Sequence, residues 1–210
     1  MSEAGVTGLG ILLSGRGSNF VAIVRAIREG VLPGVEIRVV LSNREDAPGL
    51  KAANDLGIPA CAVPAKGRGR AEHDAEMIGL LQQHGVDLVC LAGYMRLLSP
   101  GFVQAFPSRI LNIHPSLLPA FPGLDAQQQA LAYGVKISGC TVHFVDQELD
   151  HGAIILQHAV AIEDDDTTET LSARILEQEH MAYPEAIRLV TSERYEVRGR
   201  SFVRRSVHGH

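Results

Sequence analysis

The sequence has few of the residues that cross-link small proteins or anchor them in a membrane. Its three cysteines, Cys61, Cys90 and Cys140, are too few and too scattered for a disulfide framework or a zinc cluster. Cys90 and Cys140 stand in apolar strand-like runs, where a buried thiol is the usual role. No apolar run reaches the roughly 20 residues needed to cross a bilayer, and the first residues lack a secretory signal pattern. We therefore expect a reduced, cytoplasmic protein.

Positive charge and metal-ligand spacings are also scarce. Lys and Arg number 19 against 24 Asp and Glu, a net charge of -5, which disfavours nucleic acid or an anionic membrane as the main partner. The nine histidines show no His-Glu-x-x-His pattern and no Cys/His ligand spacing. A serine nucleophile elbow is absent as well. The acidic run at residues 163–166 precedes a predicted helix, where it complements the helix dipole, so we expect no metal site.

The first half of the chain alternates strand-like and helix-like segments. Strands are expected at residues 10–13, 35–41, 60–63 and 88–92, and helices at 20–27, 49–56 and 72–83. The strand at 88–92 is continuously apolar, which indicates a parallel sheet covered on both faces. The repeated strand–helix–strand order predicts a doubly wound α/β fold.

The second half of the chain does not continue the regular alternation of strands and helices. Ser99 and Pro100 predict the cap and first turn of a short helix. A strand is expected at residues 110–114, and an antiparallel pair of strands at 138–145 and 153–162. A helix is expected at 125–133, capped by Asp125. A longer helix is expected at 170–191, capped by Thr168 or Thr170 and kinked at Pro184.

These segments predict one α/β domain over residues 1–200. Its doubly wound sheet is mostly parallel, with antiparallel strands added in the C-terminal half. Residues 1–105 form the nucleotide-binding and phosphate-binding half, residues 106–200 form the catalytic half, and residues 201–210 form a flexible tail.

A glycine-rich turn at residues 14–19 lies between the first strand and the first helix. Backbone amides and the helix dipole make this a natural anion site. The turn lacks the lysine of a Walker loop, and Phe20 stands at the third glycine position of a dinucleotide fingerprint. Phosphate binding and a plain turn with Ser18 as helix N-cap both remain open.

Asn112 and His114 form the sharpest polar pair. Residues two apart on a strand point to the same face, and this strand should end at the edge where open α/β sheets bind ligands. An amide beside an imidazole suits oxyanion stabilisation and proton transfer. Asp150, in the loop that follows, could orient His114 and stabilise its imidazolium form. A hydrogen-bonded structural histidine explains the pair as easily, and Arg44 leaves an NADP-type oxidoreductase open.

Taken together, several motifs resemble the phosphoribosylglycinamide formyltransferases, a folate-dependent family of purine synthesis. The resemblance covers about residues 9–195. It rests on Ser14-Gly15-x-Gly17-Ser18-Asn19, Leu91 to Arg96, Asn112-Ile113-His114-Pro115-Ser116-Leu117-Leu118-Pro119, Val142 to Val145 with Asp150, and Gln178-Glu179-His180.

The resemblance implies a role for each of these segments, and it makes residues 106–200 the catalytic and folate-binding half of the domain. The implied catalytic trio is Asn112, His114 and Asp150. Substrate-binding residues would be Gly17, Ser18, Asn19, Phe20 and Val21 at the 5′-phosphate, and Leu176, Glu177, Gln178 and Glu179 in a second segment, with Glu179 at the ribose. Folate contacts would be Arg70, Met95, Arg96, Leu97, Leu98, Asn112, Asp146, Gln147, Glu148, Leu149 and Asp150. The implied co-substrate is 10-formyltetrahydrofolate, with no metal, in a monomer or homodimer that binds small molecules.

Four positions depart from the family pattern: Ala120, Asp125, Asp146 and His151. They bear on pocket detail rather than on reaction class, and we expect His151 to be a solvent-exposed loop residue. Two other functions remain open, a formyltetrahydrofolate hydrolase and a non-catalytic nucleotide-binding module. Such a module needs no contact between His114 and Asp150, so the distance between them is informative.

Overall fold

A computed structural model describes residues 5–192 and 195–205. The chain divides into two compact units, Met1–Asn112 and Ile113–His210. The boundary falls inside strand β5 (Ile110–His114), which carries Asn112 at the end of the first unit and His114 at the start of the second.

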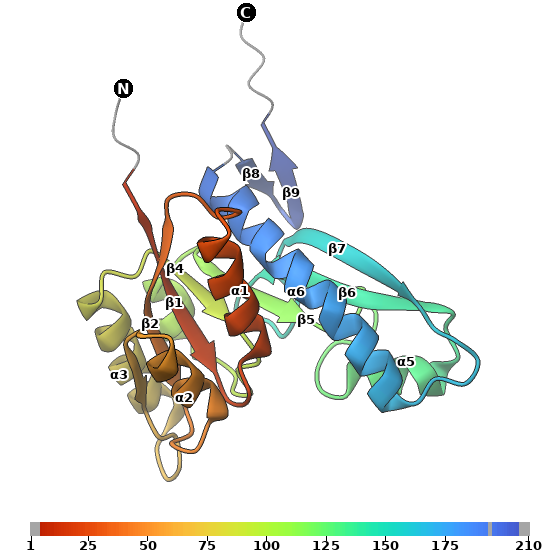
Figure 1. Cartoon of the computed structure of the whole chain (residues 1–210), viewed down its shortest axis with the longest axis horizontal. Helices are drawn as coiled ribbons and strands as arrows, with labels where there is room; N and C mark the ends of the chain where they lie inside the picture. Colours follow the sequence, from red (N-terminus) through yellow and green to blue (C-terminus); the bar gives the residue numbers. More distant parts are fainter. Residues whose placement is uncertain (1–4, 193–194, 206–210) are drawn as a thin grey trace, which may run out of the picture. The chain divides into compact units, whose positions relative to one another are not determined.

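The first unit is built on a parallel sheet with strand order β3-β2-β1-β4-β5 (Figure 1). Its other strands are β1 (Thr7–Leu13), β2 (Val35–Ser42), β3 (Ala60–Ala62) and β4 (Leu88–Leu91); its helices are α1 (Ser18–Arg28), α2 (Pro48–Asp55), α3 (Arg70–Gln83) and α4 (Pro100–Ala105). Helix α1 contacts α2, and α3 contacts α4. Right-handed crossovers place these two pairs on opposite faces of the sheet, which confirms the doubly wound fold.

Close packing between β1 and α3 explains a glycine inside a strand. A Cβ added at Gly10 would lie 2.5 Å from Leu81 Cδ2 and 2.9 Å from Val86 Cγ1. Glycine therefore lets the helix approach the sheet at this position. The central strands are buried on both faces, as the apolar run predicted.

The second unit contains β6 (Ile137–Phe144), β7 (Ile154–Ala161), β8 (Tyr195–Arg198) and β9 (Ser201–Arg204), with helices α5 (Ala126–Tyr133) and α6 (Thr168–Ser192). Strands β6 and β7 are antiparallel, as expected, and the order is β6-β7-β9-β8. Helix α6 packs on β6, β7 and α5. Cys140 on β6 is fully buried, as expected, and this burial raises the pKa of its thiol to about 12.

The C-terminal segment differs from the expected flexible tail. Residues Ser201–Arg204 form β9, which pairs with β8. The rings of Phe202 and Tyr195 lie 4.9 Å apart, and Phe202 also lies near Phe144. Aromatic contacts of this kind stabilise a short hairpin that composition alone does not reveal. Residues 206–210 lie outside the described part of the chain.

Two helix caps also differ from expectation. Ser18 is the first residue of α1, and Gly17, with φ of 74°, occupies the cap position instead. Asp125 does precede α5, but its φ is 56°, and within the described residues its side chain accepts no capping hydrogen bond. Side-chain capping requires an extended backbone at the cap, which Asp125 does not have.

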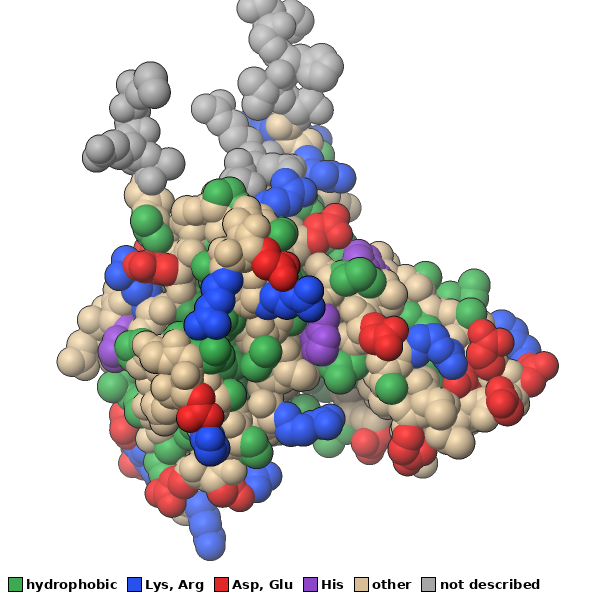
Figure 2. Space-filling model, viewed as in Figure 1, with side chains coloured by type: hydrophobic (Ala, Val, Ile, Leu, Met, Phe, Trp, Pro, Cys, Tyr) green, Lys and Arg blue, Asp and Glu red, His purple; other side chains and the backbone are tan. Residues whose placement is uncertain are grey.

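The acidic run at residues 163–166 has structural partners. Arg174 donates to both carboxylate oxygens of Asp166 at 2.7 and 2.9 Å, and Thr167 Oγ1 accepts from Thr170 N at the start of α6. Thr167 therefore takes the capping role expected of Thr168 or Thr170. Figure 2 shows acidic side chains gathered where β7 leads into α6. Over the described residues, no cluster of His, Cys, Asp or Glu is suited to hold a metal ion.

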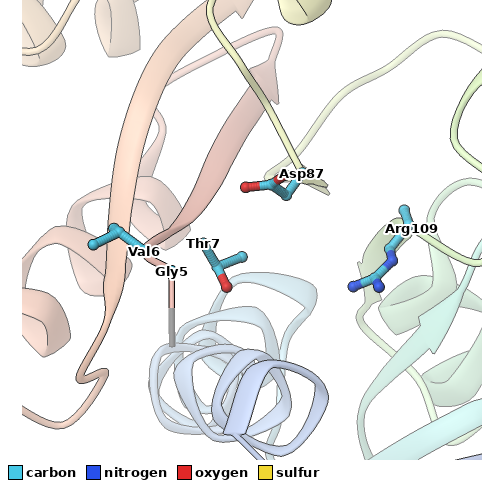
Figure 3. A pocket seen from close by; sticks show the side chains of 5 residues that line it. All are labelled: Gly5, Val6, Thr7, Asp87 and Arg109. Atoms are coloured by element: carbon cyan, nitrogen blue, oxygen red, sulfur yellow. The ribbon is translucent and has the colours of Figure 1, made fainter. Parts of the chain in front are cut away.

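A hollow of about 370 Å³ lies in the first unit, lined by Gly5, Val6, Thr7, Asp87 and Arg109 (Figure 3). These residues begin or precede β1, β4 and β5, so the hollow lies at the amino end of the parallel strands, opposite the edge where such sheets bind ligands. In the described part of the chain, no helix is long and apolar enough to cross a membrane.

Candidate active site

His114 ends β5 and begins a proline-rich loop that the rest of the second unit holds in place. Thr141 Oγ1 donates to the Ser116 carbonyl at 2.6 Å and accepts from Leu118 N at 3.0 Å. Gln157 Nε2 donates to the Leu118 carbonyl at 2.9 Å. Side chains from β6 and β7 thus replace the ladder bonds that the loop cannot make, and they fix where His114 stands.

Both ring nitrogens of His114 face oxygen atoms. Nε2 donates to the Phe121 carbonyl at 2.8 Å, and Nδ1 lies 3.4 Å from Asp150 Oδ2. The two side chains are 6% and 7% exposed. Each ring nitrogen of His114 therefore has an oxygen atom as its neighbour, and the Asp150 carboxylate and the Phe121 carbonyl hold the ring in one orientation. The contact that a non-catalytic module would not need is present.

Asp150 is held by a backbone amide as well as by histidine. Its φ is 50°, a left-handed conformation that is uncommon outside glycine. Gly123 N donates to Asp150 Oδ2 at 2.8 Å. Unusual backbone conformations with well-defined side-chain partners concentrate at functional sites. These contacts fix the Asp150 carboxylate beside Nδ1 of the His114 ring.

His143 is a member of this cluster that the sequence did not assign to the site. Its Nε2 lies 3.7 Å from Asp150 Oδ1, and its Nδ1 donates to the Phe144 carbonyl at 2.8 Å. The register of β6 against β7 shifts between Val142 and His143, and such bulges often re-aim a side chain beside an active site. The sequence signal that could have pointed to His143 is the pair of polar residues, Thr141 and His143, which stand two apart on an otherwise apolar strand.

Burial lowers the pKa of His143 below its ordinary 6.5, against opposing contributions from Phe144 and Asp150. The unfolded chain therefore binds a proton near pH 6.5 that the folded chain does not, and stability falls as pH decreases below that value. We expect the free energy of unfolding to decrease between pH 7.5 and 5.5, and to decrease less in His143→Asn. Urea unfolding at the two pH values measures this difference.

A control variant separates this effect from general acid sensitivity. His84→Gln alters the histidine at the C-cap of α3 and should keep the wild-type pH dependence. Some decrease should persist in His143→Asn, because burial also lowers the pKa of His180. Equal pH dependence in His143→Asn and wild type would refute the assignment of a buried neutral ring.

The neighbouring loop holds a second aspartate–histidine contact. His151 Nδ1 lies 2.9 Å from Asp146 Oδ2, and Asp146 Oδ1 accepts from Glu148 N at 2.9 Å. His151 is 37% exposed on its side chain, so it is a partly exposed loop residue with a carboxylate partner. Both departures from the family pattern in this loop therefore contact one another.

In the first unit, the glycine-rich turn lies where the strand order reverses. Strand β1 lies between β2 and β4, so the loops that follow β1 and β4 flank the switch point at which doubly wound sheets bind ligands. At Gly17, a Cβ would lie 3.1 Å from Leu13 Cδ2 and 3.2 Å from Gly49 Cα, and φ is positive. Both features favour glycine at this position. The turn leads into the N-terminus of α1, the end of a helix at which anions bind.

The loop after β4 contains the predicted folate segment. Met95 and Leu97 are exposed apolar side chains, and Arg96 Nη2 donates to the Arg68 carbonyl at 3.4 Å. Arg70, the predicted contact for the folate tail, is exposed at the first position of α3. Exposed apolar side chains beside cations suit a ligand with a flat ring and an acidic tail.

Other predicted residues lie on α6 and in the loop after β6. Leu176 and Glu179 are three apart, on one face of α6, and Glu179 is buried. Gln178 Oε1 lies 3.3 Å from His158 Nδ1. In the loop, Leu149 is 57% exposed. Of the predicted site residues, the structure brings His114 and Asp150 into contact inside the second unit.

Arg44 does not suit a 2′-phosphate. Its Nε and Nη2 donate to the two oxygens of Asp46 at 3.0 and 2.8 Å. A bidentate carboxylate occupies the fork that a phosphate would need, which disfavours an NADP-type oxidoreductase.

Comparison with known proteins gives the family. The sequence model described as formyl transferase matches residues 9–187. The chain belongs to the formyl transferase family. Among solved structures, it is similar to glycinamide ribonucleotide transformylase 1 from Symbiobacterium toebii, with 52% identity and a TM-score of 0.92 over 95% of this chain and 94% of that one.

Two curated relatives are also similar in sequence to most of this chain. Phosphoribosylglycinamide formyltransferase from Escherichia coli strain K12 is 43% identical over 83% of this chain and 82% of its own length. The trifunctional purine biosynthetic protein adenosine-3 of Gallus gallus is 45% identical over 89% of this chain. The chain spans only 19% of that longer relative.

Proposed function

We propose that the chain transfers the formyl group of 10-formyltetrahydrofolate to the amine of N1-(5-phosphoribosyl)glycinamide, in purine synthesis in the cytoplasm. The observation that carries the proposal is the buried contact between His114 and Asp150 at the end of β5, in a chain whose relatives bear that activity in their names.

The acceptor amine attacks the formyl carbon directly. A C–N bond forms, and the carbonyl π electrons move to oxygen, giving a tetrahedral intermediate with an oxyanion and an ammonium. Asn112 and His114 lie two apart on β5, so their side chains share a face of the strand. The Asn112 amide and a cationic His114 would stabilise the oxyanion by hydrogen bonds that strengthen as charge develops.

Collapse of the intermediate breaks the bond to N10 of the folate. The departing nitrogen needs a proton, and the ammonium must lose one. Once its Nε2 exchanges the Phe121 carbonyl for the substrate, His114 can give its proton to N10 and then take up the proton that the ammonium loses. Asp150 keeps the ring oriented and balances its charge. Asp150 is itself fixed by the Gly123 amide. Formyl transfer by this route involves no covalent enzyme intermediate.

The two loops at the switch point of the first unit would bind the substrates. The turn that ends at Gly17, Ser18 and Asn19 would hold the 5′-phosphate through backbone amides at the start of α1. The segment that contains Met95 and Leu97 would hold the folate ring. The buried carboxylate of Glu179 would accept hydrogen bonds from the ribose hydroxyls.

One assay separates the three candidate functions. Purified protein with 10-formyltetrahydrofolate and glycinamide ribonucleotide should release one tetrahydrofolate for each formylated ribonucleotide. Omission of the amine should stop the release. Amine-independent release would instead favour a hydrolase, and no release under either condition would favour a non-catalytic module; both results would contradict the proposal.

A further inference from the structure

The hydroxyl of Ser14 connects three loops at the carboxyl edge of the first unit. Ser14 directly follows β1 and is buried. Its Oγ donates to Asn43 Oδ1 at 2.6 Å and accepts from Met95 N at 2.8 Å. Its own amide donates to the Gly93 carbonyl at 3.1 Å. The side chain therefore joins the loops that follow β1, β2 and β4.

These contacts leave Ser14 little freedom to move alone. A hydroxyl has one proton, which Asn43 accepts, and its lone pairs are the acceptor for Met95 N. The neighbouring Gly15 carbonyl accepts from Gly49 N at 3.0 Å, and a Cβ at Gly49 would lie 2.6 Å from Leu13 Cδ2. Because the turn is packed against α2, a shift at Ser14 displaces the Met95 backbone rather than being absorbed locally.

We propose that Ser14 is a positioning residue that couples the phosphate-binding turn to the folate-binding segment, so that each substrate increases the affinity for the other. The inference rests on the proposed function, because it takes the ligands of the two loops from there. A ligand that shifts the turn shifts Ser14, Ser14 shifts the Met95 amide with it, and the second ligand then binds a segment that is already in its bound position. The coupling acts equally in both directions.

Tetrahydrofolate and glycinamide ribonucleotide test this coupling without reaction, since no formyl group is present. Calorimetry gives the dissociation constant of the ribonucleotide alone and with saturating tetrahydrofolate. The wild type should bind the ribonucleotide about fivefold or more tightly in the ternary complex, the lower end of ordinary coupling. In Ser14→Ala this ratio should decrease to about one, and Ser14→Thr should restore it.

Ser138→Ala is a matched control. Ser138 is also buried, on β6, and its Oγ has no hydrogen-bond partner among the described residues. It should retain the wild-type ratio. An additional measurement needs no variant: in the wild type, glycinamide ribonucleotide alone should slow hydrogen exchange at the Met95 amide.

The outcomes are distinct. A wild-type ratio of one, an unchanged ratio in Ser14→Ala, an equal loss in Ser138→Ala, or unchanged Met95 exchange would each overturn the inference. Failure of the proposed function has a different signature, because the wild type would then not bind these ligands or would not form product in the formyl-transfer assay.

Discussion

Replacement of His114 by alanine is expected to decrease kcat for formyl transfer by about 10²–10³, the usual cost of losing one oxyanion donor. The variant loses the proposed proton donor to the leaving nitrogen and leaves Asp150 buried without its histidine partner. The KM for the ribonucleotide should change little, because its phosphate is assigned to the turn after β1. Initial rates at varied concentrations of each substrate separate kcat from KM.

The control for this prediction is another histidine. His84 is the C-cap residue of α3, and the His84→Ala variant should keep the wild-type kcat. Calorimetry with glycinamide ribonucleotide shows whether His114→Ala still binds the acceptor. A variant that binds it normally and retains more than about a third of wild-type kcat would rule out a chemical role for His114, since a lost donor costs about 10² or more.

Gly152→Ala is expected to have the second large effect, through the position of Asp150. A Cβ at Gly152 would overlap the carbonyl oxygen of Phe144, the last residue of β6. Strand β6 is anchored by its pairing with β7, so we expect the loop that contains Asp150 to move instead. A misplacement of about 1 Å at a catalytic group can cost about 10² in rate, and overpacking costs about 1–3 kcal/mol of stability.

Gly79→Ala provides the matched substitution. Gly79 lies inside α3, and a Cβ there would meet nothing within 4 Å. The change should leave kcat unaltered and increase the free energy of unfolding by about 0.5–1 kcal/mol, because alanine favours a helix. Steady-state rates and urea unfolding of the two variants measure both quantities. Wild-type kcat in Gly152→Ala would show that the loop tolerates displacement and that Asp150 need not be held precisely.

Local sequence patterns predicted most of the fold. Continuous apolar runs fixed the buried parallel strands, and Ser99 before Pro100 marked a real cap, since Ser99 Oγ accepts from Phe102 N. The errors occurred where backbone conformation depends on distant packing. Asp125 is held with positive φ, and β9 forms because Phe202 meets aromatic rings elsewhere in the second unit. Periodicity carries no information about such contacts.

The candidate site shows the same division. Strand alternation predicted that Asn112 and His114 share a face, and the family resemblance suggested Asp150 as their partner. Periodicity could not reveal His143 as a neighbour of Asp150, because a register shift in β6 sets its position. It could not reveal the bond between Ser14 and Met95 either, since 81 residues separate them. Contacts of this range depend on how the strands are ordered in the sheet.

The claim that His114 and Asp150 act as one unit in formyl transfer is tested most directly by a double-mutant cycle. We would measure kcat/KM for wild type, His114→Asn, Asp150→Asn and the double variant. Residues that act together are strongly non-additive, so the double variant should be no slower than the slower single variant, within about threefold. If instead the decreases in kcat/KM of the two single variants multiply in the double variant, the residues act independently. The 3.4 Å contact between them would then have no role in formyl transfer.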